Sequence, residues 1–354
     1  MVNFEALFMA QYEKYPLLTV QDLVKALYQS VFGCGHFVGE GGRKYMEEEL
    51  RTLDMGRDNG YIEPIGDDFC RVHLTGMLKN GLSPDTLFRL FALSSRESAG
   101  DMATMEEGLS QLESMIENGV LPLDKVASAK FIADYRAAGC PATHHSDAFR
   151  AAYSPAYRVV SARMCRYLPL LEMIDRKMAE KGNLSVAIEG GSASGKTSLA
   201  ALLNETYDCN IFHMDDFFLQ PHQRTPERFA QPGGNVDYER FRDEIAEKLS
   251  SGMPFTSQKF DCSTMSLGGY VDVEPKKLNI IEGAYSMHPQ LRGFWDIAAF
   301  LDSDPEVQKA RILRRNGEMM LRRFVNEWIP LEHVYFDNIG AREACDIVIP
   351  APEK

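Results

Sequence analysis

A glycine-rich segment just past the middle of the chain has the residue types and the spacing that bind phosphate. Its sequence, IEGGSASGKTSLA, contains the pattern G-x-x-x-x-G-K-T between Gly190 and Thr197. Glycine lets the backbone turn so tightly that successive N–H groups point at one anion. Lys196 would contact the β- and γ-phosphates of a nucleotide, and the Thr197 hydroxyl would be a ligand of Mg2+.

The segments on either side of this pattern fit a phosphate-binding loop. LSVAIE (184–189) reads as a buried strand, and TSLAALLNETY (197–207) reads as a helix whose positive end would face the anion. An ordinary glycine turn is the alternative. We expect the loop to bind ATP with Mg2+ through Gly190, Gly191, Ser192, Ala193, Ser194, Gly195, Lys196, Thr197 and Ser198.

Two sets of carboxylates follow apolar runs further along the chain. Asp215 and Asp216 follow CNIFHM, and Glu282 ends LNII. A carboxylate at that point can take the proton from an attacking hydroxyl or hold Mg2+, and we assign both roles to Asp215 and the metal role to Glu282. The alternatives are a capping or solvent-facing acid pair and a buried structural acid.

A proline- and glycine-rich segment connects these two apolar runs and is long enough to form a lid or a substrate wall. Asp237 and Tyr238 follow it at the start of a predicted helix. Asp237 could accept hydrogen bonds from vicinal sugar hydroxyls, and Tyr238 would lie beside it. The alternative for Asp237 is a helix-capping acid.

Three arginines share one face of a later predicted helix. Arg311, Arg314 and Arg315 have the spacing i, i+3, i+4 in PEVQKARILRRN. In an acidic protein such a cluster is a candidate clamp for the charge of a transferred phosphoryl group, with Arg311 and Arg315 in catalytic roles. A solvated helix face paired with acids is the alternative.

The elements that must position these residues are short apolar runs that alternate with helical patterns after residue 183. The runs are 184–189, 209–216, 278–283, 297–304 and 345–350. This alternation predicts an α/β domain of the P-loop NTPase type, with a mostly parallel five-stranded sheet and flanking helices. In such sheets the ligand lies beyond the carboxyl ends of the strands.

The part of the chain before the loop has helical periodicity instead. Residues 19–32, 83–93 and 101–119 each place apolar side chains on one helix face. We therefore predict an all-α domain of unknown role at 1–155, a connecting helix at 156–182 that Pro169 bends or splits, and a kinase domain at 183–354.

The amino-acid composition indicates in which compartment the protein works and which classes of partner it can bind. The 354 residues are 45% hydrophobic and 25% charged, with a net charge of −13 and seven scattered cysteines. No apolar run is long enough to cross a membrane, and the first residues lack the order of a signal peptide. These features predict a cytoplasmic protein without disulfides, with a small-molecule partner and no nucleic-acid or membrane partner; they leave homo-oligomerisation open.

The loop and the carboxylates together resemble the uridine kinase and phosphoribulokinase-like P-loop kinases over about half the chain, 184–350. GGSASGKTS is similar to the uridine kinase phosphate loop. MDDFF resembles Q-D-S-F-Y of uridine kinases and Q-D-D-F-F of nicotinamide riboside kinases. The resemblance implies ATP and Mg2+ as cofactors, Asp215 as the catalytic base and Phe218 as part of a nucleobase pocket.

Further motifs extend the resemblance. NVD (235–237) is similar to N-F-D of uridine kinases, which implies that Asp237 holds a ribose; IIEG implies a metal role for Glu282. KFDCSTM resembles V-Y-D-F-V-S-H, which places Phe260 where the family has a pocket tyrosine. Met265 replaces the family's pocket histidine, and Phe218 replaces the tyrosine after the base. ARILRRN is similar to the arginine-rich lid entry.

The sequence thus favours a kinase that phosphorylates a hydroxyl of a nucleoside or a similar ribose-bearing metabolite. A kinase for another metabolite, such as a vitamin precursor or a sugar phosphate, is the closest alternative. An ATP-dependent regulatory module and a catalytically silent fold are two others. The presence of Lys196, Thr197, Asp215 and Glu282 together argues against the silent fold.

Overall fold

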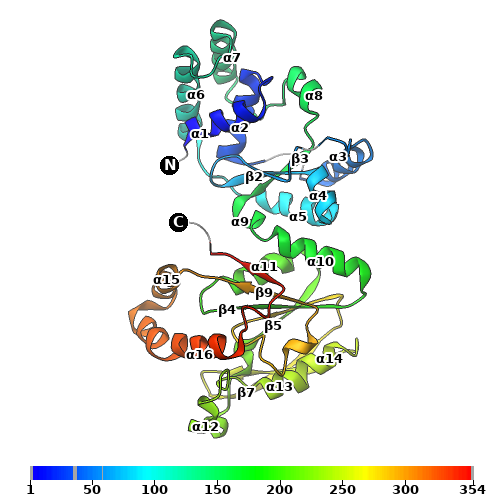
Figure 1. Cartoon of the computed structure of the whole chain (residues 1–354), viewed down its shortest axis with the longest axis vertical. Coiled ribbons are helices and arrows are strands. Elements are labelled where there is room, and N and C mark those ends of the chain that lie inside the picture. The colour runs from blue at the N-terminus through cyan, green and yellow to red at the C-terminus, as the bar shows by residue number, and fades with distance from the viewer. Residues whose placement is uncertain (1–2, 35–37, 58, 352–354) are drawn as a thin grey trace. The chain divides into compact units, whose positions relative to one another are not determined.

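The computed structural model describes residues 3–34, 38–57 and 59–351. The chain folds into two compact units, Met1–Glu172 and Met173–Lys354. The boundary between them falls inside helix α10 (Leu168–Glu180), and the first strand of the second unit begins at Leu184, one residue after the predicted start of the kinase domain (Figure 1).

The first unit is mainly helical, as predicted. The three predicted helices form, and the helix predicted over 83–93 begins after Ser83, which accepts a hydrogen bond from the Thr86 N–H at 3.0 Å, with Pro84 at the first helical position. Apolar faces of α1, α2, α6 and α7 pack together in the core of this unit. Its helices are α1 (Phe4–Lys14), α2 (Val20–Phe32), α3 (Glu40–Arg51), α4 (Leu74–Asn80), α5 (Pro84–Ser94), α6 (Met102–Glu117), α7 (Lys125–Ala137), α8 (Asp147–Tyr153) and α9 (Ala162–Cys165).

The first unit also contains a small antiparallel sheet that the sequence did not reveal. Its strands β1 (Ile62–Pro64), β2 (Phe69–His73) and β3 (Tyr157–Ser161) lie in the order β1-β2-β3. Strand β2 is buried along its whole length, so it lacks the alternation that marks a half-exposed strand.

The connecting helix predicted over 156–182 is wrong in its first part. Residues 157–161 form β3, and α10 begins only at Leu168, so that Pro169 lies in its first turn. The helical spacing of apolar residues is overridden because β3 pairs with β2 over five residues and contains the β-branched pair Val159 and Val160. The split at Pro169 agrees with the prediction.

The second unit is built on the predicted five-stranded parallel sheet. Its strands are β4 (Leu184–Gly190), β5 (Cys209–His213), β8 (Leu278–Glu282), β9 (Ile297–Leu301) and β10 (Ile347–Ile349), in the order β10-β9-β4-β8-β5. Every neighbouring pair is parallel, and β4 lies at the centre with both faces buried. The phosphate-loop segment therefore leaves the sheet from its central strand.

Helices cover both faces of this sheet (Figure 1). Helices α10 and α11 (Lys196–Thr206) lie on one face, and α13 (Tyr238–Phe241), α14 (Glu247–Leu249) and α16 (Ile329–Ile339) lie on the other. Helix α15 (Pro305–Arg323) and the short α12 (Pro226–Phe229) complete the helices. The sequence missed one element, the antiparallel hairpin of β6 (Phe255–Asp261) and β7 (Ser266–Val273).

No helix in the described parts of the chain is long and apolar enough to span a membrane.

Candidate active site

The loop between β4 and α11 has the backbone geometry of a phosphate cradle. Gly190 has φ +144°, and a Cβ there would lie 2.6 Å from the Leu301 carbonyl oxygen, so only glycine fits. Ala193 and Gly195 also have positive φ, +57° and +111°. Helix α11 begins at Lys196, so its unpaired N–H groups face the loop.

Lys196 and Thr197 occupy the positions that the pattern predicts. Lys196 is buried, and its Nζ donates to the carbonyl oxygens of Gly190 and Gly191 at 2.9 and 2.8 Å. The Thr197 hydroxyl donates to Glu282 Oε1 at 3.2 Å. The ammonium charge is thus held inside the loop, beside the hydroxyl that would bind a metal.

Asp215 projects into the same cavity from the turn that follows β5. This turn is a 3-10 helix over Met214–Phe217, so the chain bends directly at the carboxyl end of the strand. Burial by the surrounding protein raises the pKa of Asp215, while the Lys196 charge opposes the increase. Asp216 points elsewhere and pairs with Lys259 at 2.9 Å. The structure thus separates the roles of two adjacent carboxylates.

Glu282 ends β8, the strand beside β4. Its Oε1 accepts from Thr197 and lies 2.5 Å from Nδ1 of His213, and this hydrogen bond raises the pKa of the histidine. The sequence did not single out His213. Because it ends β5, it lies beside Glu282 in register across the sheet.

One cavity of about 690 Å3 at the carboxyl ends of the strands is lined by Lys196, Thr197, Asp215 and Glu282. Its volume is typical of a site for a small organic molecule. The predicted residues on its wall are Ser192, Ala193, Lys196, Thr197, Asp215, Phe218, Glu282 and Arg315. The other loop residues, Gly190, Gly191, Ser194, Gly195 and Ser198, shape the cradle without lining the cavity.

The structure does not bring Asp237 or Tyr238 to this cavity. Asp237 is 4% exposed, accepts from the Arg240 N–H at 3.1 Å and the Gln223 Nε2 at 2.8 Å, and caps α13. Asp237 therefore has the helix-capping role that was the alternative for it, and its carboxylate oxygens are already hydrogen-bonded within the protein. Tyr238 is also buried and stacks on His288 with ring centroids 3.8 Å apart.

Of the two predicted pocket phenylalanines, Phe218 and Phe260, only Phe218 reaches the cavity. Phe218 lines the cavity, and Phe260 packs behind it with ring centroids 6.4 Å apart. Phe260 is buried and does not reach the cavity, so it supports Phe218 rather than the ligand.

The predicted arginine clamp is divided between two tasks. Arg311 Nη1 donates to the carbonyl oxygen of Ala193 at 3.1 Å, so it fixes the phosphate loop from outside. Arg315 lies on the cavity wall, with its Nε bound to Asn316 Oδ1 at 2.7 Å. Arg314 is exposed and does not line the cavity.

Several residues on the cavity wall were not predicted. Asn235 and Arg224 come from the long segment before α13, and Tyr285 follows β8. Phe229, Phe324 and Trp328 add aromatic surface. The asparagine lies in the NVD motif, two positions before the acid that the sequence favoured, and it is the residue of this motif that lines the cavity. The aromatic residues lie in segments without a motif.

Two buried glutamates hold the phosphate loop. Glu189 is fully buried and accepts from the N–H groups of Gly190 at 2.9 Å, Tyr285 at 3.1 Å and Met287 at 2.9 Å; burial raises its pKa to about 7. Glu332 on α16 accepts from the Ser192 N–H at 3.0 Å, and burial raises its pKa. Neither residue was recognised as part of the site.

The donor set beside the loop suits Mg2+. Thr197 Oγ1, Asp215 and Glu282 are hard oxygen donors on one wall of the cavity. Among the described residues, no group of three or more His, Cys, Asp or Glu could hold a metal by itself. Mg2+ needs no such cage, since it takes one or two carboxylates and completes its shell with water and phosphate oxygens.

Comparisons with known proteins find kinases that are similar to the second half of the chain. No family model matches the chain. A uridine kinase of Lactococcus lactis subsp. lactis (strain IL1403) is 26% identical over 191 residues, 48% of this chain and 89% of the relative. A uridine kinase of Streptococcus pneumoniae (strain Hungary19A-6) is 27% identical over 183 residues, 47% of this chain and 84% of the relative.

A solved structure described as a possible uridine kinase from Bacillus stearothermophilus is 23% identical and has a TM-score of 0.41 over 53% of this chain and 98% of that one. The sequence relatives cover only about half of the present chain. The sequence relatives support a uridine kinase-like P-loop kinase domain in the second half of this chain.

Proposed function

We propose that this protein transfers the γ-phosphate of ATP, with Mg2+, to a hydroxyl of a nucleoside or a similar ribose-bearing metabolite. The observation that carries the proposal is that Asp215 lines the same cavity as Lys196, Thr197 and Glu282. A base, a phosphate-binding cation and metal ligands in one cavity are the parts that phosphoryl transfer to an alcohol requires.

Each residue has a stated task in this reaction. The loop amides and Lys196 hold the phosphates, and Thr197 and Glu282 would hold Mg2+, which neutralises phosphate charge when bound. Asp215 accepts the proton of the attacking hydroxyl at its carboxylate oxygen. Arg315 stabilises negative charge on the transferred group from the cavity wall.

The acceptor half of the cavity favours a flat ring attached to a polar sugar. Phe218, Phe229 and Trp328 offer aromatic faces, and Asn235 and Arg224 offer hydrogen bonds. We assign sugar binding to Asn235, because it lines the cavity beside its hydrogen-bond partner Tyr285, whereas Asp237 does not line it and caps α13. A kinase for another metabolite is the second candidate, favoured by Met265 in place of the histidine of the uridine kinase motif.

A screen of acceptors tests the proposal. The full chain with ATP and Mg2+ is assayed for ADP release against a panel of nucleosides, vitamin precursors and sugar phosphates. We expect at least one nucleoside to increase ADP release well above the rate without acceptor. Stimulation only by a metabolite without a ribose would select the second candidate, and slow release that no acceptor changes would favour a regulatory ATPase.

A further inference from the structure

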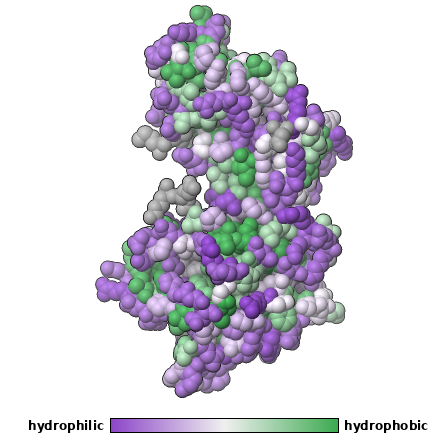
Figure 2. Space-filling model, viewed as in Figure 1, coloured by the Kyte–Doolittle hydropathy of each residue, from purple (hydrophilic) through white to green (hydrophobic). Residues whose placement is uncertain are grey.

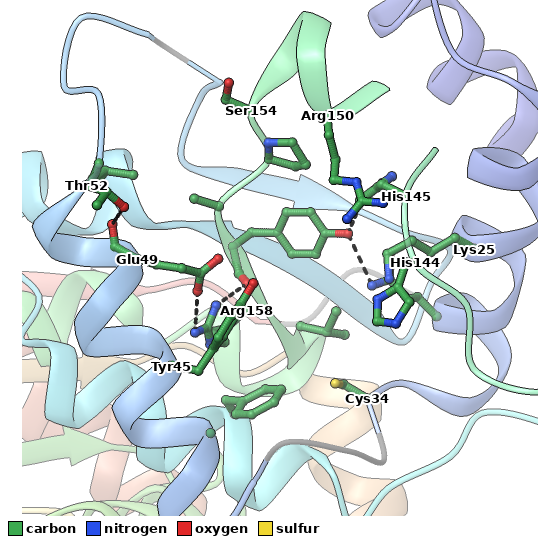
Figure 3. Close-up of a pocket in the computed structure, with 18 of the residues that line it drawn as sticks. Lys25, Cys34, Tyr45, Glu49, Thr52, His144, His145, Arg150, Ser154 and Arg158 are labelled. Carbon is green, nitrogen blue, oxygen red and sulfur yellow. Dashed lines mark hydrogen bonds and ion pairs between the residues drawn. The ribbon is translucent and has the colours of Figure 1, made fainter. Parts of the chain in front are cut away.

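The first unit contains a second large cavity, far along the sequence from the phosphate loop. It has a volume of about 670 Å3 and is lined by residues of α2, α3, α5, α8 and β3, together with the segments beside them. Figure 3 shows Lys25, His144 and Arg150 on one side of the cavity, and Tyr45, Glu49 and Arg158 on the other. None of these residues takes part in the kinase site.

The wall of this cavity is more basic than the chain as a whole. Lys25, Arg57, Arg150 and Arg158 line it against two carboxylates, Glu49 and Asp54, although the chain carries a net charge of −13. Arg158 pairs with Glu49 at 2.6 Å, and Arg57 lies 3.7 Å from Asp54. Arg158 and Arg57 thus engage the two acids of the wall, and Arg150 pairs with the exposed Asp147 at 2.9 Å.

Lys25 is the cation best placed to bind an anion. Its Nζ donates to the Thr143 carbonyl oxygen at 2.8 Å, and among the described residues no carboxylate lies within ion-pair distance. Burial, and then the charge of Arg71, lower its pKa to about 8. A half-buried ammonium with a neutral partner gains more from a bound anion than an exposed one does.

The floor of the cavity is a fixed polar network. Tyr157 Oη lies 2.7 Å from His145 Nε2 and accepts from Gln29 Nε2 at 3.3 Å. Gln29 Oε1 in turn accepts from Arg71, which is 1% exposed and pairs with Glu63 at 2.8 Å. The cavity floor formed by Gln29, His145 and Tyr157 is therefore polar and held in place by hydrogen bonds to the buried groups behind it.

Aromatic side chains complete the wall. Tyr45 and Phe91 both lie against the Arg158 guanidinium, each with a centroid 5.9 Å away. Such faces pack well on the organic part of a ligand. The cavity therefore offers cations for an anionic group and apolar surface for the rest of a small molecule.

We propose that this cavity of the N-terminal unit binds a small phosphorylated metabolite, with Lys25 and the rim arginines Arg57 and Arg150 on the phosphate and Tyr45 and Phe91 on the organic part. The site is separate from the kinase site, and the proposal stands whether or not the assignment of the kinase acceptor is right.

Pyridoxal 5′-phosphate is a direct probe of this site. Its aldehyde forms an imine with a neutral amine, which borohydride reduces to a stable adduct that peptide mass spectrometry locates. We expect labelling of Lys25 to be about tenfold faster with pyridoxal 5′-phosphate than with 5′-deoxypyridoxal, which lacks the phosphate and cannot close to a hemiacetal, because Arg57 and Arg150 hold the phosphate while the Lys25 amine attacks the aldehyde. The exposed Lys130, which pairs with Asp134, should show no such preference.

Two further arms make the result specific. Arg57→Gln with Arg150→Gln changes two exposed side chains and should remove the preference at Lys25 while leaving labelling of Lys196 unchanged. Inorganic phosphate should protect Lys25 at a lower concentration than acetate. An unlabelled Lys25, or equal labelling by the two aldehydes, would overturn the proposal, and equal protection by acetate would show that the site does not select phosphate.

Discussion

Two polar residues of one sequence segment, Asn235 and Asp237, differ in where their side chains lie. The NVD motif led the sequence analysis to Asp237, but that carboxylate caps α13 and Asn235 reaches the cavity. Spacing alone does not reveal which side chain of a motif caps the helix and which one contacts a ligand, because helix capping and ligand binding both need a short polar residue after a turn. The phosphate loop was predictable because its glycines, lysine and threonine act through a local backbone conformation.

A matched pair of variants tests this assignment. Asn235→Ala should raise the acceptor KM about tenfold or more with little change in the ATP KM, because it removes a hydrogen bond made only with the acceptor. Asp237→Ala should lower the unfolding free energy by about 1 kcal/mol through the lost cap. Steady-state kinetics and urea unfolding of both variants measure these effects. A large increase in the acceptor KM of Asp237→Ala would show that Asp237, and not Asn235, binds the sugar.

Asp215 should also affect stability as a function of pH. Burial raises its pKa in the folded protein, so the folded state holds this proton more tightly than the unfolded chain does. The contribution of this group to stability is therefore full below the unfolded pKa of about 3.9 and is lost as the pH rises through the folded value. Asp215→Asn should raise the Tm at pH 7, with the difference disappearing near pH 4.

Asp216→Asn is the control for that measurement. Its carboxylate pairs with Lys259 outside the cavity, so its replacement should leave the Tm unchanged or slightly lower at pH 7. A lower Tm for Asp215→Asn than for Asp216→Asn at pH 7 would show that Asp215 is stabilised by its surroundings.

At the scale of elements, the sheet of the second unit was predictable and the smaller sheet of the first unit was not. Each of the five parallel strands is a short apolar run bounded by helical patterns, which is a local signal. Strands β2 and β3 are defined by their pairing across a large sequence separation, and the spacing 157, 160, 164 also fits a helix. The hairpin β6–β7 has mostly exposed side chains and gives no clear alternation.

The turn from β4 into the phosphate loop gives the prediction at this scale. Gly190→Ala would place a Cβ 2.6 Å from the Leu301 carbonyl oxygen at a φ that alanine rarely adopts. We expect a loss of about 2 kcal/mol or more of unfolding free energy and weaker ATP binding. Gly182→Ala, which meets no atom within 4 Å, is the control for urea unfolding and calorimetry. Equal ATP affinity in both variants would contradict the cradle geometry.

At the scale of the whole molecule, the net charge of the protein is negative, although individual cavities carry basic side chains. The chain has a net charge of −13, and Figure 2 shows hydrophilic residues over much of the visible face. The cavity of the first unit is lined by four cations and two acids, and the cavity around Lys196 is lined by four of each. This distribution favours small phosphorylated ligands over extended polyphosphate chains.

The same distribution predicts no stable complex with nucleic acid. At about 0.15 M salt, the full chain should leave the mobility of duplex DNA and of single-stranded RNA unchanged in a gel-shift titration, because its surface repels the phosphate backbone. A shift that weakens steeply with added salt would reveal a basic surface that the net charge conceals.

The fate of the terminal phosphate of ATP tests the central claim most directly. The full chain is mixed with γ-labelled ATP, Mg2+ and the acceptor found by the screen, and the labelled products are separated. The account predicts that the label appears on the acceptor, that Asp215→Asn reduces this transfer by a factor of about 100 to 10,000 while retaining ATP binding, and that Asp216→Asn does not. Label released only as inorganic phosphate, or full transfer by Asp215→Asn, would contradict it.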